Sequence, residues 1–302
     1  MRIGAFEVNE TISALRDPIA VATLRPWIDA GNVGTLTLRR LRNALGARDL
    51  GELVKPGEFF DFTRYRPTVR YDGEEREFVI PNTRISYARR TEGPDVLFLD
   101  VLEPQAHAEE YMESIVELLS AAHVKAHWRL GAWFGGVPHS RPLRVSMSMG
   151  QRQMDVKTRR EVRRTTRYEG PTSIMSLLGP QLEARGIENN ALMLQLPHYV
   201  QFEDDHSGAA AMLEAVGTAL GLSSDVAEAI VGMKARGERQ YEQLSRMVAA
   251  DADLSRAVES FEQIYDAEHD DREPEGSALS PEIERFLGEV VRRIDDGQDR
   301  DD

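Results

Sequence analysis

The chain has 302 residues, a formal net charge of −14 and no cysteine. The lack of cysteine excludes disulfides, zinc–thiolate sites and cysteine nucleophiles, and the negative charge opposes binding to nucleic-acid phosphates. No apolar run approaches the roughly 18 residues that a membrane span needs, and the first residues lack the layout of a secretory signal. We therefore expect a cytoplasmic protein with no membrane or nucleic-acid partner.

The first part of the chain has the pattern of a strand, a helix and a hairpin. Pro18–Leu24 is a short apolar run with β-branched residues, which predicts a strand, and leucines at helical spacing from 36 to 45 predict the helix that follows. Pro67–Pro81 is predicted to form a hairpin, because Asp72 and Gly73 favour a tight turn with positive φ.

Apolar runs continue to alternate with helical segments up to residue 203. Asp95–Leu102 is almost continuously apolar, which is typical of a strand covered on both faces. The pattern predicts further strands at Arg84–Arg90, His127–Phe134, Leu143–Met149 and Ala191–Leu196. It predicts helices at His107–Ala122 and Pro171–Arg185. This alternation favours an α/β core domain, residues 1–203, with a mostly parallel sheet between helical layers.

The chain after residue 203 has helical periodicity and no strand pattern. Apolar residues recur at intervals of three and four through 204–268, which predicts a helical extension. An acidic linker is expected at 269–279, followed at 280–302 by a terminal amphipathic helix and a polar tail. Most of the negative charge lies after residue 203.

Five polar or glycine-rich motifs lie downstream of the apolar runs. They are Trp27–Gly31, Glu103–Pro104, Pro138–Pro142, Tyr168–Pro171 and Pro197–Tyr199. The carboxyl ends of parallel strands meet at one edge of a sheet, where ligands bind in open α/β folds. We therefore predict one ligand-binding crevice formed by Asp29, Gly31, Glu103, His139, Arg141, Tyr168, Glu169, His198 and Tyr199.

Several of these residues also have a structural interpretation. Asp29 is either a ligand-binding carboxylate or the cap of the following helix. Glu103 is either a proton carrier in a desolvated site or a structural hydrogen-bond acceptor. Arg141 suits an external anion or an internal ion pair with Glu103 or Glu169, and His198 and Tyr199 suit ligand contact or packing.

Motifs of several enzyme classes are absent from the sequence. There is no Gly-x-Gly-x-x-Gly or P-loop motif and no Gly-x-Ser-x-Gly nucleophile elbow. The histidines have no convincing metal-ligand spacing. We expect no metal and no cofactor.

With its five motifs in this order, the chain resembles the proteasome assembly chaperone family, in its bacterial, actinobacterial-type branch. The resemblance spans about Pro18 to Leu254. It implies a three-layer α/β/α sandwich similar to that of purine nucleoside phosphorylases, with a C-terminal helical extension. It also implies a non-enzymatic protein with a protein partner such as proteasome subunits, and a homo-oligomer for which a trimer is the first candidate.

A small-molecule function remains the alternative. In that hypothesis the predicted crevice binds a nucleoside-like or phosphate-like ligand in a phosphorylase- or hydrolase-type enzyme. Arg141 would hold the anion, and His139 or Glu103 would carry the proton.

Overall fold

The computed structural model describes residues 1–150, 152–157, 169–200 and 202–269. Residues 1–262 form one compact unit, and a second unit begins at residue 263. The predicted linker at 269–279 lies outside the described residues except for its first position, and the predicted terminal helix and tail at 280–302 lie wholly outside them. Within the described ranges, no helix is both long and apolar enough to cross a membrane.

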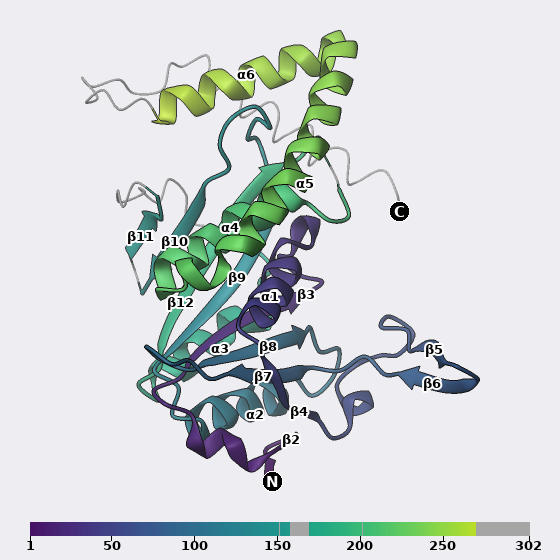
Figure 1. Cartoon of the computed structure of the whole chain (residues 1–302), viewed down its shortest axis with the longest axis vertical. Helices are drawn as coiled ribbons and strands as arrows, with labels where there is room; N and C mark the ends of the chain where they lie inside the picture. The colour runs from purple at the N-terminus through teal and green to yellow at the C-terminus, as the bar shows by residue number, and fades with distance from the viewer. Residues whose placement is uncertain (151, 158–168, 201, 270–302) are drawn as a thin grey trace. The chain divides into compact units, whose positions relative to one another are not determined.

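Among the described residues, ten strands form one sheet. They are β1 Arg2–Ile3, β2 Phe6–Val8, β3 Ile19–Arg25, β4 Arg48–Leu53, β7 Arg84–Ala88, β8 Val96–Leu102, β9 Ala126–Gly135, β10 Val145–Met149, β11 Arg152–Asp155 and β12 Glu188–Pro197. Their spatial order is β1-β2-β4-β7-β8-β3-β9-β12-β10-β11 (Figure 1). The four neighbours β8, β3, β9 and β12 pair in parallel, and the outer strands pair antiparallel.

Helices cover both faces of this sheet. The described helices are α1 Val33–Ala44, α2 Ala108–Ala121, α3 Ile174–Glu183, α4 His206–Leu220, α5 Ser223–Ala250 and α6 Ala252–His269, and α1 to α4 pack against the sheet. On one face, α2 and α3 share a hydrophobic cluster with Ala20 and Leu97. On the other face, α1 and α4 share a second cluster with Val21 and Leu194. The predicted three-layer α/β/α sandwich is therefore confirmed, with its parallel pairing in the centre of a mixed sheet.

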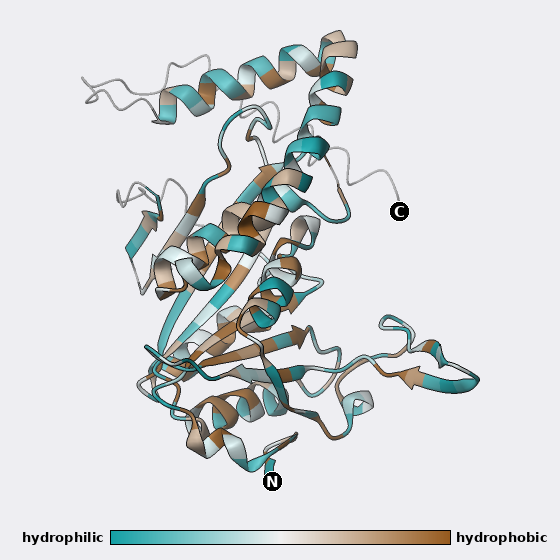
Figure 2. Cartoon of the chain, in the orientation of Figure 1, coloured by the Kyte–Doolittle hydropathy of each residue, from teal (hydrophilic) through white to brown (hydrophobic). Residues whose placement is uncertain are grey.

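The apolar runs of the sequence form the central strands. Pro18–Leu24 contributes β3 and Asp95–Leu102 contributes β8, and both have nearly continuous buried patterns. In Figure 2, β8 is hydrophobic along most of its length, as expected for a strand covered on both faces. The strands β1, β2 and β4, on one side of the sheet, were not predicted, because they are short and half-exposed and have no continuous apolar run.

The first helix of the expected extension belongs to the sandwich itself. Met212, Leu213 and Val216 of α4 are fully buried in the same cluster as strand residues of β9 and β12. The domain boundary at residue 203 stays a prediction, but α4 packs on the sheet rather than forming a separate layer beyond it.

The predicted hairpin is present as a separate two-stranded sheet. Its strands are β5 Thr68–Asp72 and β6 Glu75–Val79, and Gly73 adopts a φ of 62° in the turn between them. Figure 1 shows the hairpin extending away from the main sheet. All but one of its strand residues are exposed to solvent.

A buried histidine lies in the middle of the parallel sheet. His127 of β9 has no exposed surface, and its Nδ1 lies 3.1 Å from Asn189 Oδ1 on β12. Its Nε2 is buried without a hydrogen-bond partner among the described residues. Burial lowers the pKa of His127 to about 4 from an ordinary value of 6.5.

This pKa predicts an acid-sensitive fold. The unfolded chain binds the proton more readily than the folded chain, so stability falls as the pH drops from 6.5 toward 4. We expect His127 to remove about 2 kcal/mol of unfolding free energy between pH 7 and pH 5. Urea unfolding at both pH values should show this difference in the wild type, and a smaller one in His127→Gln. Equal pH dependence in the two proteins would contradict the assignment.

Candidate functional site

The predicted residues follow the carboxyl ends of the four parallel strands. Asp29 comes after β3, Glu103 after β8, His139 after β9 and His198 after β12. Parallel register places these strand ends at one edge of the sheet. In the described part of the chain, Asp29 and Glu103 are hydrogen-bonded to the starts of two different helices, whereas His139, His198 and Tyr199 lie together.

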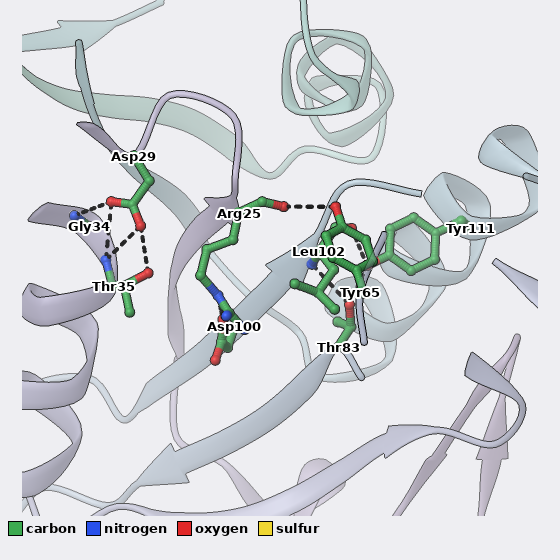
Figure 3. Close-up of polar contacts among 9 residues, drawn as sticks. All are labelled: Arg25, Asp29, Gly34, Thr35, Tyr65, Thr83, Asp100, Leu102 and Tyr111. Carbon is green, nitrogen blue, oxygen red and sulfur yellow. Dashed lines mark hydrogen bonds and ion pairs between the residues drawn. The ribbon is translucent and has the colours of Figure 1, made fainter. Parts of the chain in front are cut away.

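Asp29 is bonded to the start of α1. Its Oδ1 accepts hydrogen bonds from the backbone N–H of Gly34 at 2.6 Å and of Thr35 at 3.3 Å, and its Oδ2 accepts from Thr35 Oγ1 at 2.5 Å (Figure 3). Burial raises the pKa of the Asp29 carboxyl, and these hydrogen bonds partly oppose the rise. Unpaired amide groups at a helix start need acceptors, so Asp29 performs the capping role.

Gly31 brings the β3–α1 loop against the start of α4. Its φ is 57°, and a Cβ at this position would lie 2.7 Å from Asp205 Cβ. Its carbonyl oxygen accepts a 2.8 Å hydrogen bond from the Asp205 N–H. Asp205 caps α4 by accepting from Gly208 N at 2.7 Å, and it accepts from Tyr241 Oη at 3.0 Å. Gly31 therefore allows the start of α4 to lie close to the backbone of the β3–α1 loop.

Glu103 is bonded to the start of α3. Its Oε1 accepts from the Ile174 N–H at 3.2 Å, while its Oε2 is buried without a partner among the described residues. Burial raises the pKa of the Glu103 carboxyl. Glu103 is half-buried and combines the structural role with one unsatisfied carboxylate oxygen.

Hydroxyl groups fix the adjoining ends of β3 and β8. Tyr65 Oη donates to Glu103 O at 3.0 Å and lies 3.4 Å from Arg25 O. Tyr111 Oη is hydrogen-bonded to Thr83 Oγ1 and donates to Leu102 O at 3.2 Å (Figure 3). These bonds satisfy backbone groups that the sheet leaves open where the strands end.

His139 belongs to a cluster that holds α5 against the loop after β9. We call His139, Tyr199 and Ser245 the histidine clamp. Tyr199 Oη accepts from the His139 N–H at 2.8 Å and lies 2.8 Å from His139 Nδ1, while His139 Nε2 lies 3.2 Å from Ser245 Oγ. Because Tyr199 Oη already accepts the amide hydrogen, it is best placed to donate to Nδ1, which favours the neutral Nε2–H tautomer. Burial lowers the pKa of His139, in keeping with that neutral form.

Three of the predicted residues, Arg141, His198 and Tyr199, contact Phe261 or Glu262 of α6. Arg141 Nη1 lies 3.3 Å from Glu262 Oε1, so an ion pair forms, though with a different glutamate from those expected. The Tyr199 ring stacks on Phe261 with an interplanar angle of 3°, and the His198 ring meets Phe261 edge to face at 5.3 Å. His198 and Tyr199 therefore contribute packing.

Among the described residues, Glu169 makes none of these contacts. Glu169 is exposed, and Tyr168 lies outside the described residues. For all nine predicted residues, ligand binding stays a prediction. Their partners Asp205, Tyr241 and Ser245 were not predicted from the sequence. The spacing of four between Tyr241 and Ser245 indicates a shared helix face, but it does not indicate what that face contacts.

Comparison with known proteins places these observations in a family. The sequence matches the model of the PAC2 family over residues 23–245. A protein of unknown function from Corynebacterium glutamicum has a similar structure, with a TM-score of 0.73 and 21% identity, covering 87% of this chain and 98% of that chain. No curated protein matches the chain in sequence.

Two further solved structures are similar at higher sequence identity. A proteasome-assembly chaperone homologue from Mycobacterium tuberculosis has a TM-score of 0.66 and 25% identity, covering 80% of this chain and 99% of that chain. A PAC2 family protein from Streptomyces avermitilis has a TM-score of 0.60 and 25% identity, covering 75% of this chain and 99% of that chain. These relatives agree with the branch that the five motifs indicate.

The capping role of Asp29 predicts a loss of stability on substitution. Asp29→Ala leaves the N–H groups of Gly34 and Thr35 without their acceptor, so we expect the free energy of unfolding to fall by about 1–2 kcal/mol. Asp29→Asn keeps one acceptor oxygen and should lose less. Urea denaturation of the three proteins at pH 7 measures the difference, and an unchanged midpoint in Asp29→Ala would refute the capping role.

The histidine clamp predicts a local effect on α5. Tyr199→Phe keeps the ring on Phe261 but removes the hydroxyl that serves both His139 groups. We expect amide hydrogen exchange in α5 around Ser245 to become about tenfold faster, which corresponds to roughly 1.4 kcal/mol. Tyr71→Phe, which removes an exposed hydroxyl from the hairpin, is the matched control. Identical exchange in the wild type and Tyr199→Phe would show that the clamp does not hold α5.

Proposed function

The chain belongs to the PAC2 family, and on that premise we propose that it is a non-enzymatic protein that acts through protein–protein contacts, with proteasome subunits as its partners. The family relationship supports a proteasome-related chaperone role. The Mycobacterium tuberculosis relative is described as a proteasome-assembly chaperone homologue, which supports the same choice of partner.

The contacts that the predicted site residues make within the chain support a non-catalytic protein. Asp29 is used as a helix cap, His139 lies in the histidine clamp, and Arg141 pairs with Glu262. A general base must reach a substrate proton, and a nucleophile needs an adjacent base and an oxyanion site. These side chains instead bond to helix starts and to α5 and α6, so their present geometry serves the fold.

The observation that carries the proposal is the exposed apolar face of the hairpin. Val69 and Phe78 lie directly opposite each other, and Tyr71 shares their face because side chains alternate along a strand. Tyr71 is 69% exposed and Phe78 is 55% exposed. The guanidinium carbon of Arg76 lies over the Phe78 ring, 4.5 Å from its centroid. Val69, Tyr71 and Phe78 nevertheless remain exposed to solvent.

An isolated two-stranded hairpin with such a face is suited to a partner. Two-stranded hairpins are at most marginally stable in water, and they gain stability when another surface covers their apolar side. Aromatic residues and arginine are also enriched at the centres of protein interfaces. Val69, Tyr71 and Phe78 therefore form the docking face that we propose for the protein partner.

The docking face gives a direct test of the proposed function. The full chain would be co-expressed with the proteasome core subunits of its native host, and their co-purification measured. We expect Tyr71→Ser and Phe78→Ser each to weaken association at least tenfold, because interface aromatics commonly contribute 2 kcal/mol or more. Arg70→Ser, on the opposite face of the same hairpin, is the matched control and should bind like the wild type.

Two results would count against this function. If the wild-type chain fails to associate with proteasome subunits, the proposed partner is wrong. If association occurs but Phe78→Ser binds as well as Arg70→Ser, the hairpin is not the docking face.

A further inference from the structure

The parallel strands β3 and β8 form a topological switch point. They are neighbours in the sheet. The helix that follows β3 and the helix that follows β8 pack on opposite faces of that sheet. α1, after β3, packs in the cluster of Val21 and Leu194, whereas α2, after β8, packs in the cluster of Ala20 and Leu97. Chains that diverge in this way leave a crevice outside the carboxyl ends of the two strands, where open α/β proteins bind ligands.

A cavity of about 300 Å³ lies at this place. Its wall includes Arg25 at the end of β3 together with Asp100 and Leu102 near the end of β8. The base of the hairpin contributes Val79 and Ile80 to the same wall. This volume is at the lower end of the range for small-molecule sites. Asp29, His139 and Arg141 do not line this cavity.

The charged lining of the cavity is predominantly positive. Arg25, Arg66 and Arg84 line it together with a single carboxylate, that of Asp100. Arg25 Nε pairs with Asp100 Oδ1 at 2.9 Å (Figure 3), and Arg84 Nε lies 3.5 Å from Glu52 Oε2, with both side chains half-exposed. The exposed Arg84–Glu52 pair contributes little, and both arginines have further guanidinium N–H groups that these pairs do not use.

Of the three arginines that line the cavity, Arg66 is the one without a close carboxylate partner among the described residues. It forms no ion pair within 4 Å among the described residues, and its side chain is exposed. Its charge acts at longer range on Asp61, where it helps to lower the pKa of that carboxyl after the larger effect of hydrogen bonds from Thr63. An external anion would therefore gain an arginine that is not already committed to a close carboxylate.

We propose that this cavity binds the phosphate group of a small molecule, or phosphate itself, through Arg25, Arg66 and Arg84. A carboxylate presents two oxygens in one plane and is matched by one bidentate guanidinium. A phosphate presents oxygens in several directions and carries up to two charges, so it matches several arginines around one cavity. The apolar wall of Val79, Ile80 and Leu102 gives room beside the anion for the uncharged body of a phosphate ester.

Calorimetric titration of the full chain at low ionic strength tests this site. The probes are inorganic phosphate, adenosine monophosphate and adenosine. We expect saturable binding of inorganic phosphate, weakened at least tenfold in Arg66→Ala and in Arg84→Ala. Arg64→Ala removes an exposed arginine outside the cavity lining, so it is the matched control and should bind like the wild type.

The three probes separate the possible sources of the anion. Tighter binding of adenosine monophosphate than of phosphate, with no binding of adenosine, indicates a phosphate ester. Equal binding of the monophosphate and phosphate indicates the free ion. The proposal is overturned if neither anion binds saturably, if adenosine binds as tightly as its monophosphate, or if Arg66→Ala and Arg84→Ala bind like the wild type. None of these outcomes depends on association with proteasome subunits.

Discussion

The parallel pairing of β8, β3, β9 and β12 is the constraint on which the rest of the structure depends. β3 and β8 are buried along almost their whole length and are almost continuously apolar, and the middle parts of β9 and β12 are buried as well. The backbone groups of these strands are satisfied within the sheet. Their carboxyl ends lie at one edge. Every polar motif that follows a central strand must therefore find its hydrogen-bond partners at that edge.

The polar residues at the edge find those partners in the helices. Asp29 accepts from the start of α1 and Glu103 from the start of α3, where helices have unpaired N–H groups. His139 and Tyr199 hold α5 through Ser245. Burying such groups without bonds would cost more than the bonds contribute. Asp29, Glu103, His139 and Tyr199 thus link different elements of the fold.

Two surfaces of the described part of the chain carry the functional proposals. The docking face of the hairpin is apolar and exposed, which suits a protein partner. The cavity beside the hairpin base is lined by three arginines and one aspartate, which suits an anion. Because Ile80 lines the cavity and directly follows the β6 strand that carries Phe78, an anion in the cavity would lie close to the segment that presents the docking face.

The sequence by itself determined the central strands, the hairpin and the order of the five motifs. Periodicity and turn chemistry are local, so Asp95–Leu102 and Asp72-Gly73 indicate their structures without knowledge of distant residues. Only the tertiary structure decided what the motif residues contact. The pairing of His139 with Tyr199, and the cavity shared by Arg25, Arg66 and Arg84, join residues from separate elements. No local pattern encodes such contacts, because they depend on how helices and loops pack around the finished sheet.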